Sequence, residues 1–376
     1  MRVERRTVAA AGEVPITVLM PVYNVEPYLR GALASVFGQT WSEFELLVVN
    51  DGSTDRTREI LAETRDPRLR VIDRPHGGLA AALRCGVAEA RGRYLARMDG
   101  DDEAFPQRLA VQKARLDHAP GVVLVHGPAQ AIDADGRPLP IVLGDPRASA
   151  VTKWLLLWQN PIIHPTVMLR LSALRAHDLN YRLELFRADE FDLWNRLAPH
   201  GDFEAIPEVL HRYRFHPESM TRRNPANLHL AAFTRVIREN FERLELSLAP
   251  PVAEELAAIS GGTWIDPITH RYPHLRGALH GLQAALARRF CGASGTEPAA
   301  LAAVQAEQLV RWARYMLATS RPYAARLLRE AVARRRVALR APYFWAVAAA
   351  LALPAGLRAR LARRDARRAP MSARMD

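Results

Sequence analysis

The sequence predicts an α/β protein, in which a mostly parallel sheet flanked by helices is followed by an all-α C-terminal part. Three observations lead to this fold class. Short apolar runs alternate with helically spaced segments through the first hundred residues, polar residues follow each run, and beyond about residue 225 only helical spacing continues. Strand–helix alternation builds a right-handed parallel sheet. We therefore expect two domains, 1–225 and 226–376.

The first strands of the sheet are expected at four short apolar runs bounded by turn residues. They cover residues 16–21, 44–49, 69–72 and 94–98. Strands buried on both faces of a parallel sheet need such continuous apolar runs. The helices between them are expected over residues 28–37, 55–63 and 78–90. Ser53 or Thr54 is the expected cap of the second helix.

The pattern loosens from residue 121 onwards. We expect strands at 122–127 and 163–170, a hairpin turn at 133–137 and a short helix at 190–197. Further helices are expected at 228–244, 275–290, 298–317 and 322–337, with a break at Pro250-Pro251. These later helices would form the C-terminal domain.

The composition is that of an ordinary globular protein. The chain of 376 residues is 49% hydrophobic and 24% charged, which excludes collagen-like and low-complexity classes. Its two cysteines, Cys85 and Cys291, exclude a disulfide framework or a cysteine-rich zinc site and favour a reducing compartment. The N-terminal segment lacks the apolar stretch of a signal peptide. We therefore expect a cytoplasmic protein.

Most of the net charge of +12 lies in the C-terminal tail. Residues 311–376 hold sixteen arginines and three acidic residues, a sum of +13. Such a tail suits an anionic partner, either a membrane surface or nucleic acid; the alternative is a solvated arginine-rich helical face. The arginines cluster beside an apolar stretch that begins with the aromatic residues 343–345, so a membrane surface is preferred and no nucleic acid partner is expected.

A stretch of 17 uncharged residues, 341–357, lies within this tail and is flanked by arginines. It is shorter than the roughly 20 apolar residues that cross a bilayer, and it contains Pro342 and Pro354. An interfacial helix and a buried helix are the two leading alternatives, and a membrane span comes third. The interfacial alternative would hold the protein peripherally on the inner face of a membrane.

Polar residues follow four of the expected strands, where ligands bind in open α/β sheets. They are Pro21 to Asn24, Asn50-Asp51, His76 to Gly78 and Asp99 to Asp101. Two carboxylates one residue apart, with a glycine between them for a tight turn, suit a hard divalent cation such as Mg²⁺ or Mn²⁺. The structural alternative for these residues is a turn or a helix cap.

Six segments stand out together. They are VLMPVYNVEPYLRGALASVFGQT, FELLVVNDGSTDRT, GRYLARMDGDDEAFPQRL, NPIIHPTVMLR, ADEFDLWNRLA and HRYRFHPESMTR, and they are spread over about residues 14–222. Jointly they resemble the family-2 glycosyltransferases of the GT-A fold, which are inverting enzymes. The resemblance implies a nucleotide-diphospho-sugar donor, with a UDP-sugar as first choice, and Mn²⁺ or Mg²⁺ as cofactor. It does not name the sugar.

The resemblance also assigns residues to the donor site. Pro21, Tyr23 and Asp51 fall in the nucleotide-binding positions, and Asn24 and Gly77 lie beside them in the expected pocket. A carboxylate such as Asp51 can accept hydrogen bonds from a base imide or a ribose hydroxyl.

A second group of residues is assigned to the metal and the phosphates. Asp99 would contact the ribose or sugar and help to bind the metal, and Asp101 would bind the metal-diphosphate group. His216 would ligate the metal or touch the diphosphate, and Arg214 would neutralise phosphate charge. For His216, as for His164, the alternative is a hydrogen-bonded structural histidine.

The catalytic base is expected at the start of the helix at 190–197. The family commonly has Glu-Asp before an aromatic residue, whereas this sequence has Asp189-Glu190 before Phe191. The aligned base is therefore Glu190, with Asp189 in reserve. Either carboxylate can take the proton of an acceptor hydroxyl. The structural alternative is a pair of acids that complements the helix dipole.

We therefore expect an inverting, metal-dependent glycosyltransferase that acts on a glycan or glycolipid acceptor in cell-surface glycan synthesis. A non-catalytic sugar-nucleotide-binding or scaffolding protein is the alternative, which only the swapped order of Asp189 and Glu190 favours. Trp154, Trp158 and Trp194 could stack on sugar rings, but their helical spacing favours a place in the core.

Overall fold

The computed structural model describes residues 14–185, 187–219, 230–260 and 321–334, with a few isolated helical positions between 274 and 313. The contacts of the chain divide it into two units, Met1–Ser247 and Leu248–Asp376. The division follows helix α8 (Leu230–Arg243), which packs against α7 (Asp189–Leu197) within the first unit. The expected domain boundary near residue 225 stays a prediction.

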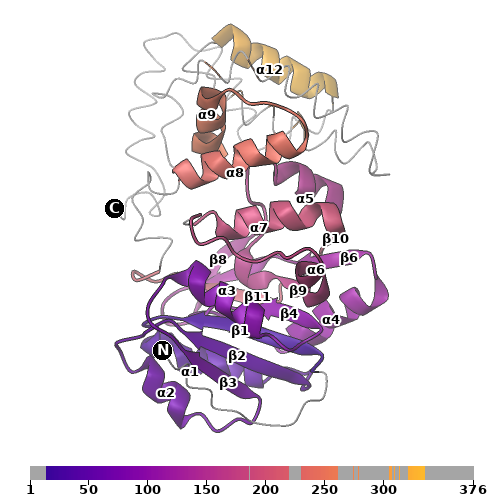
Figure 1. Ribbon diagram of the computed structural model, residues 1–376. Helices are drawn as coiled ribbons and strands as arrows, with labels where there is room; N and C mark the ends of the chain where they lie inside the picture. Colours follow the sequence, from indigo (N-terminus) through magenta and orange to yellow (C-terminus); the bar gives the residue numbers. More distant parts are fainter. Residues whose placement is uncertain are drawn as a thin grey trace. The chain divides into compact units, whose positions relative to one another are not determined.

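A seven-stranded sheet forms the centre of the first unit (Figure 1). Its strands are β1 (Ile16–Val22), β2 (Phe44–Asn50), β3 (Leu69–Asp73), β4 (Tyr94–Arg97), β6 (Val122–His126), β9 (Met168–Arg170) and β10 (Asp202–Ala205). They are arranged in the order β10-β6-β9-β4-β1-β2-β3. Only β9 runs antiparallel to its neighbours. The predicted mostly parallel sheet is confirmed.

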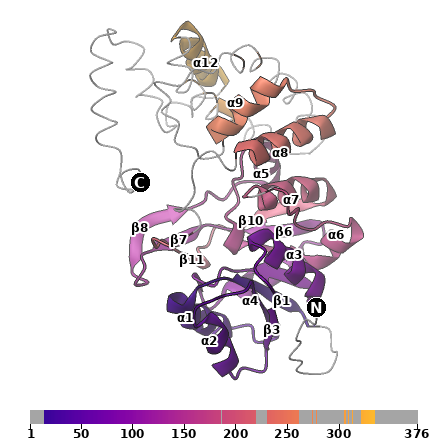
Figure 2. The ribbon, with the colours of Figure 1, turned by 60° about the vertical axis from the view of Figure 1, so that its left-hand side comes forward.

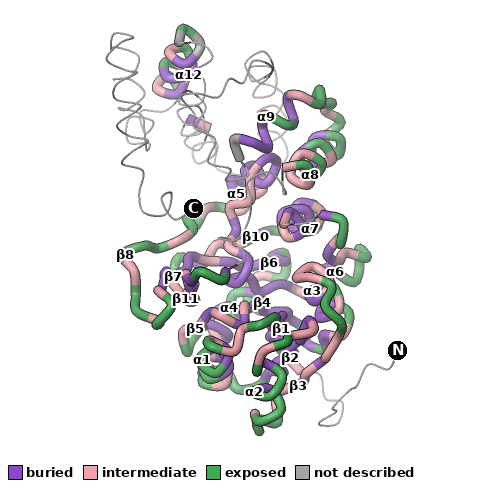
Figure 3. Tube along the Cα trace, turned by 90° about the vertical axis from the view of Figure 1, so that its left-hand side faces the viewer, coloured by how far each residue is buried: buried purple, intermediate pink, exposed green. Residues whose placement is uncertain are grey.

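Helices cover both faces of this sheet. One face packs against α1 (Glu26–Phe37), α2 (Thr57–Glu63) and α4 (Arg108–His118), and the other packs against α3 (Leu79–Glu89). At Gly86 of α3 a Cβ atom would lie 2.1 Å from Cδ1 of Leu19, so this close approach requires glycine. Strands β1 and β2 are buried along their whole length, as their apolar sequences predict (Figure 3).

A second sheet joins residues that are distant in sequence. It contains β5 (Glu103–Ala104), β11 (His211–Arg214), β7 (Ala129–Ile132) and β8 (Pro138–Leu143), in that order. The expected hairpin turn at 133–137 connects β7 to β8, which forms the outer edge of the sheet (Figure 2). Strand β5 directly follows the acidic turn at residues 99–102 and pairs with β11. The pairing therefore brings residues after 210 to that turn.

The remaining described elements are helical. They are α5 (Ser149–Leu155), the 3-10 helices η1 (His164–Thr166) and η2 (Ala198–His200), α6 (Leu171–Ala176), α9 (Pro250–Ser260) and α12 (Arg321–Arg334). Among the residues that the structure describes, no helix is both long and apolar enough to cross a membrane.

Three sequence-based expectations about the elements were wrong. Only Met168–Arg170 of the expected strand 163–170 is a strand, because His164 and Pro165 begin a 3-10 turn. Neither Ser53 nor Thr54 caps α2; their side chains bond to Asn24 instead. Residues 250–260 form α9, because the two prolines occupy the first helical turn, where no N–H is needed.

The expected helix at 190–197 and the burial of Trp154, Trp158 and Trp194 are confirmed, with exposed fractions of 3% or less for the tryptophans. The expected helices at 275–290 and 298–317 and the apolar stretch at 341–357 lie outside the described residues, apart from isolated positions.

Candidate active site

The loop after β1 is tied to the loop after β2. Asn24 has a positive φ of 51°, a conformation that asparagine tolerates better than most residues. Its N–H donates to Oγ of Ser53 at 3.0 Å, and its Oδ1 accepts the N–H of Thr54 at 2.8 Å. Pro21 lies buried in β1 beside Val49 of β2. Asn24 therefore ties the two loops together, and Pro21 lies in the strand that leads into the first of them.

Asp51 is 2% exposed and already has several partners. Its carboxylate accepts the N–H groups of Gly77 and Gly78, at 3.1 and 2.7 Å, and forms an ion pair with Arg74. Gly78 has a φ of +88°, which few other residues adopt, and the chain enters helix α3 directly after it. Asp51 thus fixes the loop at 77–78, and its role in binding a nucleotide stays a prediction.

Tyr23 forms an open aromatic surface beside this carboxylate. Its ring is 44% exposed and stacks on His76, with centroids 4.1 Å apart and an interplanar angle of 25°. Nδ1 of His76 lies 2.9 Å from Oδ2 of Asp51. An exposed, pre-oriented ring of this kind suits stacking on a planar base.

The acidic turn after β4 brings several predicted residues together. Asp99 forms an ion pair with Arg97, which is 4% exposed. Burial raises the pKa of Asp99, while Arg97 opposes the shift. Oδ2 of Asp101 lies 2.9 Å from Nε2 of His216, more than a hundred residues away in sequence. His216 is 5% exposed, and its ring packs against Tyr28 with centroids 4.5 Å apart.

Asp102 differs from its two neighbours because both its oxygens are engaged. Oδ2 lies 2.8 Å from Nε2 of His211, and Oδ1 accepts the N–H of Arg214 at 2.8 Å. Nη1 of Arg108 in turn lies 3.1 Å from Nδ1 of His211. Burial, and then the charge of Asp101, raise the pKa of Asp102 well above its ordinary value. Asp102 therefore anchors β11 beneath the turn.

The guanidinium of Arg214 donates hydrogen bonds to other groups of this chain. Nε donates to the carbonyl of Asp101 at 2.7 Å, Nη2 to Glu103 at 2.7 Å, and Nη1 to the carbonyls of Asp133 and Ala134. The guanidinium thus ties the acidic turn to the β7–β8 hairpin. Its predicted contact with phosphate remains untested.

The donor atoms near the turn fit a divalent cation. The carboxylates of Asp99, Asp101 and Asp102 each offer an oxygen within 4.8 Å of the others. Because both Asp102 oxygens are engaged, the predicted ligand set of Asp99, Asp101 and His216 stays a prediction, with Nε2 of His216 in contact with Oδ2 of Asp101. Two carboxylates suit Mg²⁺ or Mn²⁺, and an imidazole ligand favours Mn²⁺ over Mg²⁺.

A second acidic cluster begins helix α7. Asp189 is 3% exposed, and its Oδ2 has no hydrogen-bond partner. The side chain of Glu190 is 25% exposed and lies with Oε2 3.5 Å from Nδ1 of His164. Burial raises the pKa of Asp189 to about 6, and burial with the neighbouring Asp189 raises that of Glu190 to about 8. A carboxylate with a raised pKa is a stronger base when it is ionised.

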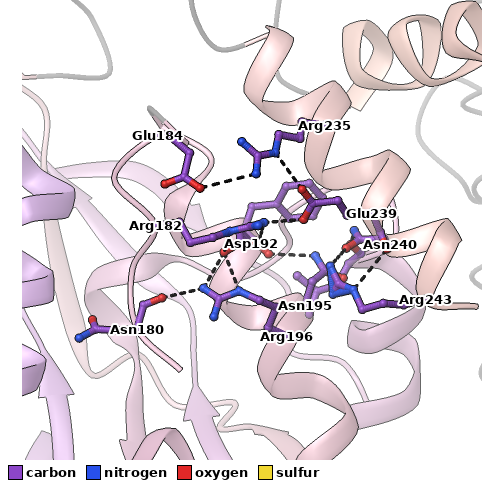
Figure 4. A network of polar contacts seen from close by, with 12 residues as sticks. Asn180, Arg182, Glu184, Asp192, Asn195, Arg196, Arg235, Glu239, Asn240 and Arg243 are labelled. Carbon is purple, nitrogen blue, oxygen red and sulfur yellow. Dashed lines mark hydrogen bonds and ion pairs between the residues drawn. The ribbon is translucent and has the colours of Figure 1, made fainter. Parts of the chain in front are cut away.

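Asp192, one turn further along α7, is fully buried and held by two arginines (Figure 4). Arg196 donates Nε at 2.8 Å and Nη2 at 2.6 Å, and Arg182 makes a two-pronged contact from the loop before the helix. Arg182 also reaches Glu239 of α8 at 2.6 Å. This network holds α7, and with it Asp189 and Glu190, in place.

Three residues of the site were missed from the sequence. Arg97 pairs with Asp99, Arg74 with Asp51, and His211 with Asp102. Arg97 could have been found, because a charged residue inside the apolar run YLARM needs a buried partner. Arg74 and His211 carry no comparable signal, because their partners are brought to them by the fold.

Known proteins match this chain most clearly over its first half. The model of Glycosyl transferase family 2 matches residues 17–174. The putative glycosyltransferase EpsE of Bacillus subtilis is 31% identical over 218 residues, which are 56% of this chain and 76% of that protein. An uncharacterized glycosyltransferase of Haemophilus influenzae is 27% identical over 54% of this chain. The match spans 65% of the latter protein's length.

The fold is similar to that of S. aureus TarS. The crystal structure of TarS 1-349 in complex with UDP-GlcNAc has a TM-score of 0.53 at 17% sequence identity, and the match covers 85% of this chain and 88% of that one. At this identity the likeness concerns the fold, which is of the GT-A type with its mixed sheet between helices. The sequence matches establish that the chain belongs to the family-2 glycosyltransferases.

Proposed function

We propose that this chain transfers a sugar from a nucleotide-diphosphate donor to a hydroxyl acceptor, with inversion at the anomeric carbon. One observation supports the proposal: the acidic turn after β4, whose carboxylates suit a cation, lies near enough to α7 for the charge of Asp99 to act on the carboxylate of Glu190. Burial and Asp189 dominate the raised pKa of Glu190, and the charge of Asp99 adds to it. Displacement at an anomeric carbon needs stabilisation of the leaving diphosphate and a base for the acceptor, and these clusters supply both.

The donor would bind beyond the carboxyl ends of β1, β2 and β4. Tyr23 stacks on the base, and Asp51 with Asn24, Pro21 and Gly77 shapes the nucleotide pocket. Because TarS was crystallised with UDP-GlcNAc, a UDP-sugar is the first donor to test.

Asp99, Asp101 and His216 would hold Mn²⁺ or, less favourably, Mg²⁺. When bound, the cation neutralises the charge that develops on the departing diphosphate. Arg214 supports this site indirectly, because its Nε donates to the carbonyl of Asp101 and so fixes the acidic turn.

Glu190 would accept the proton of the acceptor hydroxyl as that oxygen attacks. It is more exposed than Asp189, so a substrate can reach its carboxylate. A single displacement with one base inverts the anomeric configuration. Asp189, buried behind it, keeps the pKa of Glu190 high.

Two experiments test the proposal. Calorimetric titration with UDP, GDP, CDP and TDP, each with and without Mn²⁺, should show metal-dependent binding of one nucleotide, UDP first. With the matching sugar donor, Glu190→Gln should lower kcat by about 10²–10⁴-fold while the nucleotide still binds. Asp189→Asn, its matched control, should lower kcat less. Nucleotide binding without turnover in the wild type would instead favour a non-catalytic binding protein.

The acceptor is proposed to be a glycan or glycolipid at a membrane surface, where the arginine-rich tail at 311–376 would bind anionic lipid. Flotation with vesicles containing anionic lipid should carry the full chain upward at low salt and release it at high salt. Recovery of all protein in the soluble fraction at low salt would contradict the membrane proposal.

A further inference from the structure

A buried histidine lies behind Glu190. His164, the first residue of η1, is 6% exposed. Its Nδ1 lies 3.5 Å from Oε2 of Glu190, and its Nε2 lies 2.9 Å from the hydroxyl of Tyr181, which is 3% exposed. The three side chains therefore form a row that runs from the interior to the partly exposed carboxylate.

The protonation states of this row give its hydrogen bonds a direction. Burial lowers the pKa of His164 well below its ordinary value, so the imidazole is neutral and has one donor and one acceptor nitrogen. Burial likewise raises the pKa of Tyr181, so the phenol keeps its proton. If the phenol donates to Nε2, the imidazole proton lies on Nδ1 and faces Glu190. The opposite tautomer would point a nitrogen lone pair at a carboxylate oxygen.

Packing fixes the ring in this orientation. The indole of Trp194, on the same helix as Glu190, meets the His164 ring edge-on, with centroids 5.7 Å apart and an interplanar angle of 77°. The Tyr181 ring lies on another side, at 5.8 Å and 43°. The imidazole therefore has little freedom to turn away from Glu190.

We infer that His164, oriented by Tyr181, is a positioning residue that donates its Nδ1–H to Glu190 and aims the carboxylate at the acceptor hydroxyl. The inference rests on the proposed role of Glu190 as base. A separation of 3.5 Å is long for a hydrogen bond, and such contacts commonly tighten when the substrate binds. This hydrogen bond transfers no proton to the substrate, so His164 acts only by orienting Glu190.

Other charged groups also face Glu190 and are unchanged by substitution of His164. They are Asp189 on α7, Arg187 just before it, and Arg97 and Asp99 on β4 and the turn that follows. A shift in the pH profile on changing His164 therefore reports the histidine itself.

Two substitutions of His164 test the contacts of its two nitrogens separately. In His164→Asn the side-chain amide takes the place of Nδ1 and keeps a donor toward Glu190. In His164→Gln the amide takes the place of Nε2 and keeps only the contact with Tyr181. We expect His164→Gln to lower kcat about tenfold, to leave KM for the donor unchanged and to raise the pKa of the acid limb by about one unit. His164→Asn should restore kcat to within about threefold of the wild type.

Tyr181→Phe gives a second, independent measurement, with Tyr94→Phe as its control. Both tyrosines are buried, and the Tyr94 hydroxyl donates to Asp117 at 2.6 Å. Both variants should lose some thermal stability, but only Tyr181→Phe should move the acid limb of the pH profile. If His164→Gln does not fold, this pair decides the question.

The outcomes distinguish the inference from the proposed function. Full activity of Glu190→Gln would overturn the assignment of the base, and the inference with it. If Glu190→Gln is inactive while His164→Gln and Tyr181→Phe keep the wild-type pH profile, the base stands and the role of His164 is refuted. Equal loss of kcat in His164→Asn and His164→Gln would likewise refute the donor role of Nδ1.

Discussion

Two acidic clusters, at residues 99–102 and 189–192, are built on the same plan. In each, one carboxylate is buried and bonded on both oxygens: Asp102 in the first and Asp192 in the second. The other carboxylates of each cluster are less completely paired. One residue of each cluster thus holds the backbone in place, and its neighbours are left for chemistry.

The clusters differ in what neutralises their anchoring carboxylate. Asp192 is paired with two guanidinium groups, whereas Asp102 is bonded by a neutral imidazole and a backbone N–H. In the first cluster, burial raises the pKa values of Asp99 and Asp102, and the charge of Arg97 opposes both shifts. In the second, burial raises the pKa of Asp189 to about 6 and that of Glu190 to about 8, so Glu190 holds its proton more tightly than Asp189 does. In the proposed function, similar acidic residues serve a metal in one place and a proton in the other.

Removing a cation ligand should have the largest effect. We expect Asp101→Asn to lower metal-dependent turnover by on the order of 10²–10³-fold, because the charge of the leaving diphosphate loses its stabilisation. Initial rates over a series of Mn²⁺ concentrations measure this. Asp135→Asn, on the exposed β7–β8 hairpin, is the control and should behave like the wild type. Unchanged Mn²⁺ dependence in Asp101→Asn would place the metal elsewhere.

Removing the anchor of the second cluster should affect stability most. Asp192→Ala leaves Arg182 and Arg196 without their buried partner, and we expect it to lower the free energy of unfolding by about 3–5 kcal/mol. Urea denaturation measures the loss. Asp189→Asn should cost far less, because the Asp189 oxygen Oδ2 has no partner to lose. A similar loss in both variants would contradict the division of roles.

The pH dependence of activity should follow Glu190. With a pKa of about 8, its basic form is lost as the pH falls, so kcat should decrease about tenfold per unit below pH 8. Initial rates between pH 6 and about 9 at saturating donor measure this. An activity that is flat down to pH 6 would argue against a base of this pKa.

The raised pKa of Glu190 also affects the stability of the fold. Stability is favoured at low pH, whereas activity is favoured at high pH. The pKa of Glu190 rises from 4.5 to about 8 on folding, so the folded state holds the proton more tightly. Its stabilising contribution is complete below about pH 4.5 and is lost as the pH rises to about 8. Glu190→Gln should therefore gain Tm relative to the wild type as the pH rises through this window. Parallel Tm curves would contradict the shift.

The smallest effect is expected at the edge of the Asp192 network. Glu184 and Arg235 are about half exposed and 3.6 Å apart (Figure 4). Glu184→Gln should change the free energy of unfolding by less than about 1 kcal/mol, because solvent screens exposed pairs. A loss comparable to that in Asp192→Ala would show that the network acts as one cooperative unit.

The sequence by itself predicted six strands of the seven-stranded sheet, three of the helices that cover it and the family, and it missed β10, α4 and the strands β5 and β11 of the second sheet. Apolar runs such as residues 44–49 must be buried on two faces, so their length and spacing are visible in the letters. The same local logic located the acidic turn at 99–102 and the start of α7. Where a 3-10 turn replaced the first part of the expected strand at 163–170, the pattern of apolar residues could not tell the two apart.

Only the tertiary structure decided which members of each acidic cluster are structural. Asp102 and Asp101 have the same side chain one position apart, yet β11 brings His211 to the first and His216 follows to meet the second. Likewise His164, at the start of η1, lies beside Glu190 of α7, and Tyr181 contacts His164 from another segment of the chain. Pairing, burial and pKa depend on neighbours that are far away in sequence, because the dielectric surroundings of a charge are set by the packed fold.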